Sequence, residues 1–352
     1  NYRELNDLGI TTAIGITKEN EDYKLYIEVL KTEQGSSKEA KTPEFVIFES
    51  TGKTIQEASR MSILESSKRL YINHISILII DEELAKNGIK DIMDIFFRDA
   101  ESRKQFYTLV TNEDIKKLMN TESLLESLNS KSISDRLKVN ENFLSNTTPI
   151  TFSKLLTKYV NPNKEMIMPS LKLVDLENDE DKPKQKIVIG DTAIFKDDKL
   201  IGYINGEETL YLNLIDNEVK DSVLTTFNKK DYVTIEINES KTKIDVADRH
   251  INIKINLSGN IAELNDVEDL TNDNTIKDLE LLFENDLNNN INSFIKKIID
   301  EYNTDIFGFK DLIYKKDYKN YHDLELKDIT YSIQSDIKLR FKGNGAYELN
   351  EN

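Results

Sequence analysis

The tripeptide Gly52-Lys53-Thr54 is the sharpest candidate for chemistry, because a P-loop ends in Gly-Lys-Ser/Thr just before a helix and binds nucleotide phosphates. The full motif also needs a glycine five residues before the Gly-Lys pair. Ile47 occupies that position, inside an expected strand. No loop is left whose backbone N–H groups could surround a phosphate, so Thr54 is better explained as the residue that caps the following helix.

Histidine chemistry is the next candidate, and the chain has three histidines, His74, His250 and His322. They are far apart in the sequence, and no Gly-x-Ser-x-Gly elbow accompanies them. We expect each to be structural, with His74 inside the most apolar strand. The chain has no cysteine, which removes thiol nucleophiles, disulfides and Cys-ligated metals together. The acidic runs 177–181 and 266–273 lack the spacing of a calcium loop. We therefore expect no catalytic residue, no metal site and no cofactor.

Charge and length narrow the remaining function classes. The net charge of −17 argues against nucleic acid, since phosphate binding needs clustered lysine and arginine. The longest apolar run is strand-sized, well short of the ~20 residues that span a bilayer. A chain of 352 residues predicts two or three domains, because single cores stop growing at roughly 250–300 residues.

The N-terminal third predicts alternating strands and helices. Strands are expected over 9–17, 23–30 and 44–49, followed by a helix over 54–68 that opens with a Thr54–Glu57 capping box. Residues 71–80 should form one strand buried on both faces, because isoleucine and leucine occupy both sets of alternating positions. A helix capped by Asp81 follows, and the next helix buries a stripe of Ile92, Ile95 and Phe96. A strand over 104–110 returns to the sheet.

Four charged residues crowd the end of that last helix: Arg98, Asp99, Glu101 and Arg103. Arginine can make bidentate pairs with carboxylates. The cluster is therefore either an internal group of ion pairs that ties the helix to the next strand or a surface that a partner binds. We keep these four residues as partner-surface candidates.

The whole pattern predicts an α+β, multidomain protein of mixed sheets with helices packed on them. We expect an N-terminal α/β domain at 1–118, a helical middle region with an acidic linker at 119–182, and a C-terminal α+β domain at 183–352. In the last domain, INIKINL at 251–257 puts four apolar side chains on one face. A long helix over 276–302 should cover the resulting antiparallel sheet.

Several short segments, in order along nearly the whole chain, match one known protein family. They are Arg3-Glu4-Leu5-Asn6, Arg69-Leu70-Tyr71 to His74, Glu83-Leu84-Ala85 with Gly88-Ile89, the Arg98-Asp99, Glu101 and Arg103 cluster, Gly190 to Gly202, and Asp305-Ile306-Phe307-Gly308. In these segments the chain resembles the Ger(x)C family, the C subunits of nutrient germinant receptors in endospore-forming bacteria.

The resemblance implies a secreted lipoprotein made with a signal peptide. Its lipidated cysteine, which carries diacylglycerol and palmitate, is expected just upstream of Asn1 and is absent from this chain. Two acyl chains would hold the full-length protein on the outer face of the spore inner membrane, and the chain without them is expected to be soluble. The implied partners are the membrane-embedded A and B type receptor subunits, and the family brings no enzymatic residues with it.

We therefore expect a non-enzymatic, lipid-anchored receptor subunit with a scaffold or signal-transmission role in spore germination. The alternative is an extracytoplasmic protein that itself binds the nutrient germinant in a cleft. An extracytoplasmic hydrolase that depends on His74 is the third possibility.

Overall fold

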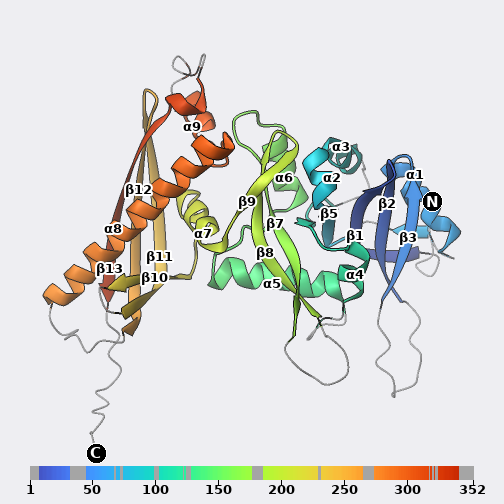
Figure 1. Cartoon of the computed structure of the whole chain (residues 1–352), viewed down its shortest axis with the longest axis horizontal. Helices are drawn as coiled ribbons and strands as arrows, with labels where there is room; N and C mark the ends of the chain where they lie inside the picture. The colour runs from blue at the N-terminus through green and yellow to red at the C-terminus, as the bar shows by residue number, and fades with distance from the viewer. Residues whose placement is uncertain are drawn as a thin grey trace, which may run out of the picture. The chain divides into compact units, whose positions relative to one another are not determined.

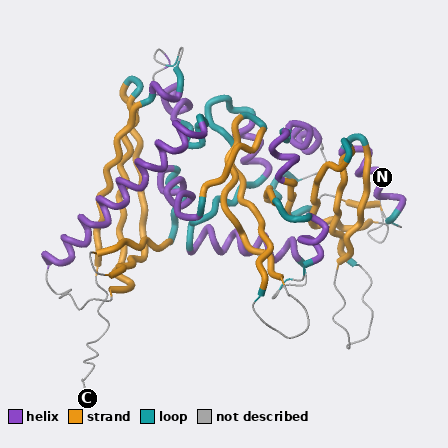
Figure 2. The backbone as a smooth tube through the Cα atoms, viewed as in Figure 1, coloured by secondary structure: helices purple, strands orange, loops and turns teal. Residues whose placement is uncertain are grey.

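The computed structural model describes most of the chain, and its strands form two separate sheets (Figure 2). The chain divides into two compact units. The first comprises Asn1–Val139, Thr147–Gly206 and Thr304–Gly308, and the second comprises Asn140–Asn146, Glu207–Asn303 and Phe309–Asn352. The described residues are 8–31, 45–66, 69–71, 74–98, 103–121, 123, 128–176, 185–228, 231–264, 273–316, 318, 321 and 324–340.

The larger sheet belongs to the first unit and follows the order β3-β2-β1-β5-β6-β7-β8-β9 (Figure 1). Three antiparallel strands begin it: β1 (Leu8–Glu19), β2 (Asp22–Leu30) and β3 (Phe45–Gly52). Next to β1 lie three parallel strands, β5 (Ile77–Asp81), β6 (Tyr107–Thr111) and β7 (Ile167–Asp175). The hairpin of β8 (Gln185–Lys196) and β9 (Lys199–Ile204) completes the sheet. Because β7 pairs with β8, strands on both sides of residue 182 share one sheet; the division at 1–118, 119–182 and 183–352 stays a prediction.

Helices cover both faces of this sheet and bury two hydrophobic clusters. One cluster lies under α1 (Ile55–Met61), α2 (Glu82–Asn87), α3 (Lys90–Arg98) and α6 (Phe152–Tyr159). The other lies under α4 (Ile115–Asn120) and α5 (Asn129–Phe143). Leu78 and Ile80 of β5 enter the first cluster, and Ile77 and Ile79 enter the second. This confirms that residues 77–80 form a strand buried on both faces.

The predicted strand 71–80 is wrong in its first half. A short strand, β4 (Arg69–Tyr71), pairs with β1, and β5 begins only at Ile77. His74 precedes β5 and is exposed. The isoleucines alone did not show the break, because Ile75 is buried although it precedes β5.

The second unit holds a four-stranded sheet in the order β10-β11-β12-β13. Its elements are α7 (Gly206–Ile215), β10 (Ser222–Asn228), β11 (Asp231–Ala247), β12 (His250–Leu264), α8 (Asp273–Lys297), the π-helical turn η4 (Ile298–Tyr302), α9 (Phe309–Lys316), the 3₁₀ turn η6 (Leu326–Asp328) and β13 (Thr330–Arg340). The predicted face of β12 is buried, and α8 runs along the sheet (Figure 1). The α+β class with a C-terminal sheet and one long helix is confirmed.

One detail of that sheet differs from the prediction, because β13 pairs parallel to β12 rather than antiparallel. The long helix α8 connects the two strands. A crossover helix returns the chain to the end of the sheet where the previous strand began, so the next strand runs parallel. Within the described residues, no helix combines the length and the apolar character that a bilayer crossing needs.

Candidate functional site

Gly52, Lys53 and Thr54, which resemble the end of a phosphate-binding loop, lie directly before the helix α1. In the structure these residues position that helix. Gly52 lies directly against it, since a Cβ there would be 2.4 Å from the backbone nitrogen of Ala58. The Thr54 hydroxyl accepts a hydrogen bond from the Glu57 N–H at 3.1 Å, so the predicted helix cap is present. The Lys53 ammonium lies 2.6 Å from the carboxylate of Asp22. That lysine therefore has a carboxylate partner in the protein.

The helix α3 is attached to the sheet by polar contacts and by an apolar stripe. The Tyr23 hydroxyl of β2 donates a hydrogen bond of 2.8 Å to Asp91 in the first turn of α3. Burial, and then the Asp91 carboxylate, raise the pKa of Tyr23 to about 12, so the phenol stays protonated and donating at neutral pH. Ile92 and Phe96 of the predicted stripe are buried, and Ile95 is half-buried.

A cavity of about 240 Å³ lies over the sheet between α1 and α3. Its floor consists of aliphatic side chains of β1 and β2, namely Ile14, Ile16, Leu25 and Ile27. Ile55, Ser59 and Arg60 of α1 line one side, and Ile95 and Phe96 of α3 line another. Among the residues that the structure describes, none in this lining is acidic. The cavity opens to solvent beside Arg60 and Ile63, and a concave, largely aliphatic hollow of this kind is a candidate binding site.

Three large apolar side chains are exposed beside the cavity, within four consecutive residues. Met61 is 42% exposed, Ile63 is 50% exposed and Leu64 is 77% exposed. They lie at the end of α1 and in the 3₁₀ turn η2 (Ser62–Leu64), and Ile63 also lines the cavity. We call Met61, Ile63 and Leu64 the η2 apolar surface. Grouped exposed apolar residues are typical of a surface that a partner covers.

Sequence reasoning missed the η2 apolar surface, although a signal was present. On a helix that buries Ile55 and Ala58, Met61 and Leu64 fall outside the buried stripe. Apolar residues outside the buried stripe of an amphipathic helix indicate a second contact surface. The cavity itself had no comparable signal, because its walls come from elements that are distant in the sequence.

The predicted charged cluster is described at two of its four positions. Arg98 is exposed and pairs with Asp94 of its own helix, with 2.9 Å between Nε and Oδ1. Arg103 is also exposed. Asp99 and Glu101 lie outside the described residues. Phe97, 55% exposed, lies beside them in sequence, and the Lys104 ammonium is 5.4 Å from its ring centroid. Arg98, Asp99, Glu101 and Arg103 stay partner-surface candidates.

The two histidines that the structure describes belong to different units. His74 is exposed and precedes β5, and His322 lies outside the described residues. The His250 ring lies on β12, with Nε2 3.2 Å from the hydroxyl of Ser332 and Nδ1 2.7 Å from the hydroxyl of Thr330. A Ser–His–Asp triad needs a carboxylate at the second ring nitrogen, and a threonine hydroxyl takes that place. This contact therefore cannot orient a base as a triad does.

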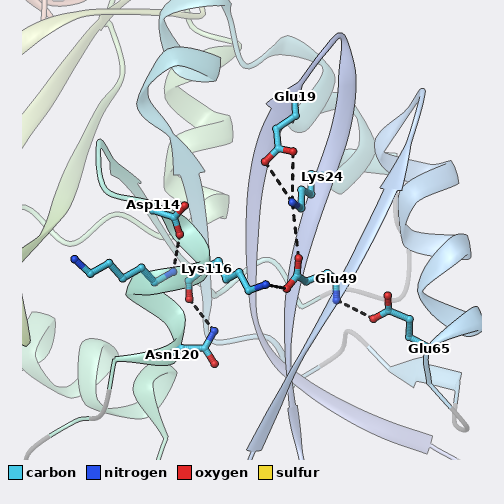
Figure 3. Close-up of polar contacts among 8 residues, drawn as sticks. Glu19, Lys24, Glu49, Glu65, Asp114, Lys116 and Asn120 are labelled. Carbon is cyan, nitrogen blue, oxygen red and sulfur yellow. Dashed lines mark hydrogen bonds and ion pairs between the residues drawn. The ribbon is translucent and has the colours of Figure 1, made fainter.

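A charge network occupies the opposite face of the β1–β3 region (Figure 3). Lys24 lies 3.3 Å from Glu19 and 3.8 Å from Glu49, and Lys116 of α4 lies 2.6 Å from Glu49. Asp114 caps α4 by accepting from the Lys117 N–H at 2.7 Å. The network connects α4 to three adjacent strands, so its function is structural. The described residues contain no group of three or more histidine, aspartate or glutamate side chains placed to hold a metal ion.

Comparisons with known proteins cover nearly the whole chain. Residues 1–173 match the family described as "Spore germination protein N-terminal domain". Residues 190–343 match the family described as "Spore germination B3/ GerAC like, C-terminal". The interval between the two matches, 174–189, includes residue 182, where we expected the acidic linker to end.

Curated relatives and a solved structure agree with these matches. Spore germination protein KC of Bacillus subtilis (strain 168) is 25% identical over 341 residues, covering 89% of this chain and 83% of that protein. Spore germination protein B3 of the same organism is 24% identical over 324 residues, covering 86% and 81%. The crystal structure of the GerBC protein superposes with a TM-score of 0.61 at 21% identity, covering 93% of this chain and 96% of that one.

Proposed function

The chain belongs to the GerAC-like family of spore germination proteins. We propose that it is a non-enzymatic subunit of a nutrient germinant receptor. In this proposal it serves as a scaffold or signal-transmitting surface for membrane-embedded A and B type subunits. A lipidated cysteine upstream of Asn1 would hold the full-length protein on the outer face of the spore inner membrane. Two acyl chains provide stable anchoring without a membrane-spanning helix.

The observation that carries the scaffold role is the η2 apolar surface. Leu64 is 77% exposed, and its neighbours Met61 and Ile63 are 42% and 50% exposed. Covering such side chains stabilises a complex by roughly 25 cal/mol per Å² of apolar area removed from water. Interface cores are depleted of charge and contain large apolar side chains. A receptor subunit that binds partners through this surface explains why the side chains are exposed in the isolated chain.

Co-purification of the full-length, lipidated protein with its A and B type subunits tests the proposal. A Leu64→Asp substitution should strongly reduce recovery of the partners, because a carboxylate buried in an apolar contact is not compensated. Leu281→Asp is the matched control, since Leu281 is 56% exposed on α8 in the other unit. Failure of the unsubstituted protein to co-purify would refute the receptor role. Equal recovery with Leu64→Asp and Leu281→Asp would refute the η2 apolar surface as the contact.

A second function is favoured by a different observation, the cavity between α1 and α3. In this function the protein itself binds a small nutrient molecule. A ligand present at about a hundred times its dissociation constant should stabilise the folded protein by ~2.7 kcal/mol. A thermal-shift screen with nutrient germinants would detect that gain in stability. If none of them shifts the melting temperature, the small-molecule function is refuted and the scaffold role remains.

A further inference from the structure

The cavity between α1 and α3 combines a mostly aliphatic floor with the guanidinium of Arg60 at its side. Its floor and far wall are aliphatic and aromatic, from Ile14, Ile16, Leu25, Ile27 and Phe96. An apolar cavity of about 150 Å³ is known to hold a benzene molecule. The volume here, about 240 Å³, has room for an apolar body larger than benzene, such as a short aliphatic chain.

The polar side chains of the cavity come from α1 and the residue that follows it. The Ser62 hydroxyl donates to the Ser59 carbonyl at 2.7 Å, so it already has a partner. Arg60 is exposed, and it forms no ion pair with any residue that the structure describes. A guanidinium presents a fork of N–H donors that matches a carboxylate. Among the described residues that line the cavity, Arg60 is the charged side chain, so a carboxylate is the head group that would pair with it.

We propose that this cavity binds a small amphipathic monocarboxylate, with its aliphatic part over β1 and β2 and its carboxylate on Arg60. The inference rests on the second function above and specifies its ligand class. One arginine can pair bidentately with one carboxylate, whereas phosphorylated ligands are typically recognised by clusters of arginines. An ammonium head group would meet Arg60 as a like charge.

Calorimetric titration of this chain with straight-chain carboxylates of increasing length tests the proposal. Butanoate, hexanoate and octanoate should bind about fourfold more tightly for each added CH₂, that is ~0.8 kcal/mol, until the cavity is full. Hexylamine, which has the same tail and the opposite charge, should not bind measurably. Hexanol, which has the tail alone, should bind more weakly than hexanoate.

Two variants separate the tail site from the head-group site. Arg60→Gln should weaken hexanoate about two- to fivefold and leave hexanol unchanged, because only an exposed ion pair is lost. Ser59→Phe should abolish binding of both, since a half-buried helix position then fills the cavity from its rim. Arg340→Gln, at another exposed arginine without an ion pair among the described residues, is the control and should bind like the unsubstituted chain.

Several outcomes would overturn the proposal. They are no binding by any carboxylate, equal binding of hexanoate and hexylamine, or unchanged binding in Ser59→Phe. Binding of hexanol that Arg60→Gln and head-group charge do not affect would refute the carboxylate class while keeping a small-molecule site. If no ligand binds and Ser59→Phe prevents co-purification with the receptor subunits, the cavity receives a partner side chain instead. The receptor role is decided separately, by co-purification of the unsubstituted protein.

Discussion

Replacing Glu280 and Glu284 together with alanine should open the outer edge of β13. This strand ends the second sheet, so half of its N–H groups lack a strand partner. Two of them bind carboxylates of α8: the Ile337 N–H donates to Glu284 Oε1 and the Leu339 N–H to Glu280 Oε1, each at 2.9 Å. Their spacing of two residues matches the alternation of N–H directions along a strand. The long helix therefore protects the edge as well as the face of the sheet.

The expected loss of stability follows from the kind of bond. A hydrogen bond to a charged group contributes ~1.5–3 kcal/mol net. Both glutamates are partly exposed, so water can replace the lost carboxylates and the lower end applies. The double substitution should therefore lower the free energy of unfolding by ~3 kcal/mol. Alanine and glutamate both favour helix, so α8 itself should persist, and the exposed pair of Lys338 with Glu280 adds little.

Amide hydrogen exchange and urea denaturation measure the two consequences. In the double alanine variant, the amides of Ile337 and Leu339 should exchange much faster, and the urea midpoint should fall. Glu280→Gln with Glu284→Gln keeps a side-chain oxygen as acceptor and should recover most of the stability. Asp278→Ala is the matched control, because Asp278 is an exposed acid of the same helix without a described partner.

The reasoning would be refuted if both amides kept their protection in the double alanine variant. It would also be refuted if that variant lost no more stability than Asp278→Ala. In either case the carboxylates would be ordinary surface charges, and the edge of β13 would owe its protection to something else.

Three further predictions concern the first unit. Burial raises the pKa of Glu28 above its ordinary value of 4.5, so the folded protein keeps a proton that the unfolded chain releases. The free energy of unfolding should then fall as the pH rises above about 4.5 through the folded pKa; Glu28→Gln should flatten that part of a urea pH series, and an unchanged slope would contradict the assignment. Phe152→Ala removes a ring that is fully buried and should cost ~3–5 kcal/mol in urea denaturation, whereas Phe143→Ala, at a side chain 66% exposed, should change stability by less than about 0.5 kcal/mol. Gly52→Ala places a Cβ 2.4 Å from the backbone nitrogen of Ala58 and should cost ~1–3 kcal/mol, so a urea midpoint equal to that of the unsubstituted protein would argue against this close packing.

The features that were predicted most accurately from the sequence depend on residues that are close together in the chain. Thr54 and Asp81 cap their helices through N–H groups three residues away, at 3.1 and 3.0 Å. The alternation at 251–257 likewise placed one face of β12 in the core. Each cap joins two groups of one short segment, and the alternation at 251–257 lies within one strand. The spacing of residues in the sequence is therefore enough to predict these features.

Two elements of the second unit, α7 and β10, were not predicted from the sequence. Residues 209–215 of α7 are buried on every side, so the helix shows no apolar stripe against a polar one. In β10 the inward positions are Ser222, Leu224 and Thr226, so burial alternates while hydrophobicity does not. Periodicity reports contrast between two faces, and neither segment has that contrast.

Family membership, the α+β class and the caps formed by Thr54 and Asp81 could be determined from the sequence alone, because they depend on short ordered segments and local spacing. The cavity and the parallel pairing of β13 were decided only by the tertiary structure. The cavity brings Ile14 and Leu25 of the first two strands against Arg60 of α1 and Phe96 of α3. Which side chains meet across such distances depends on how helices pack on a sheet, and no spacing within one segment encodes that packing.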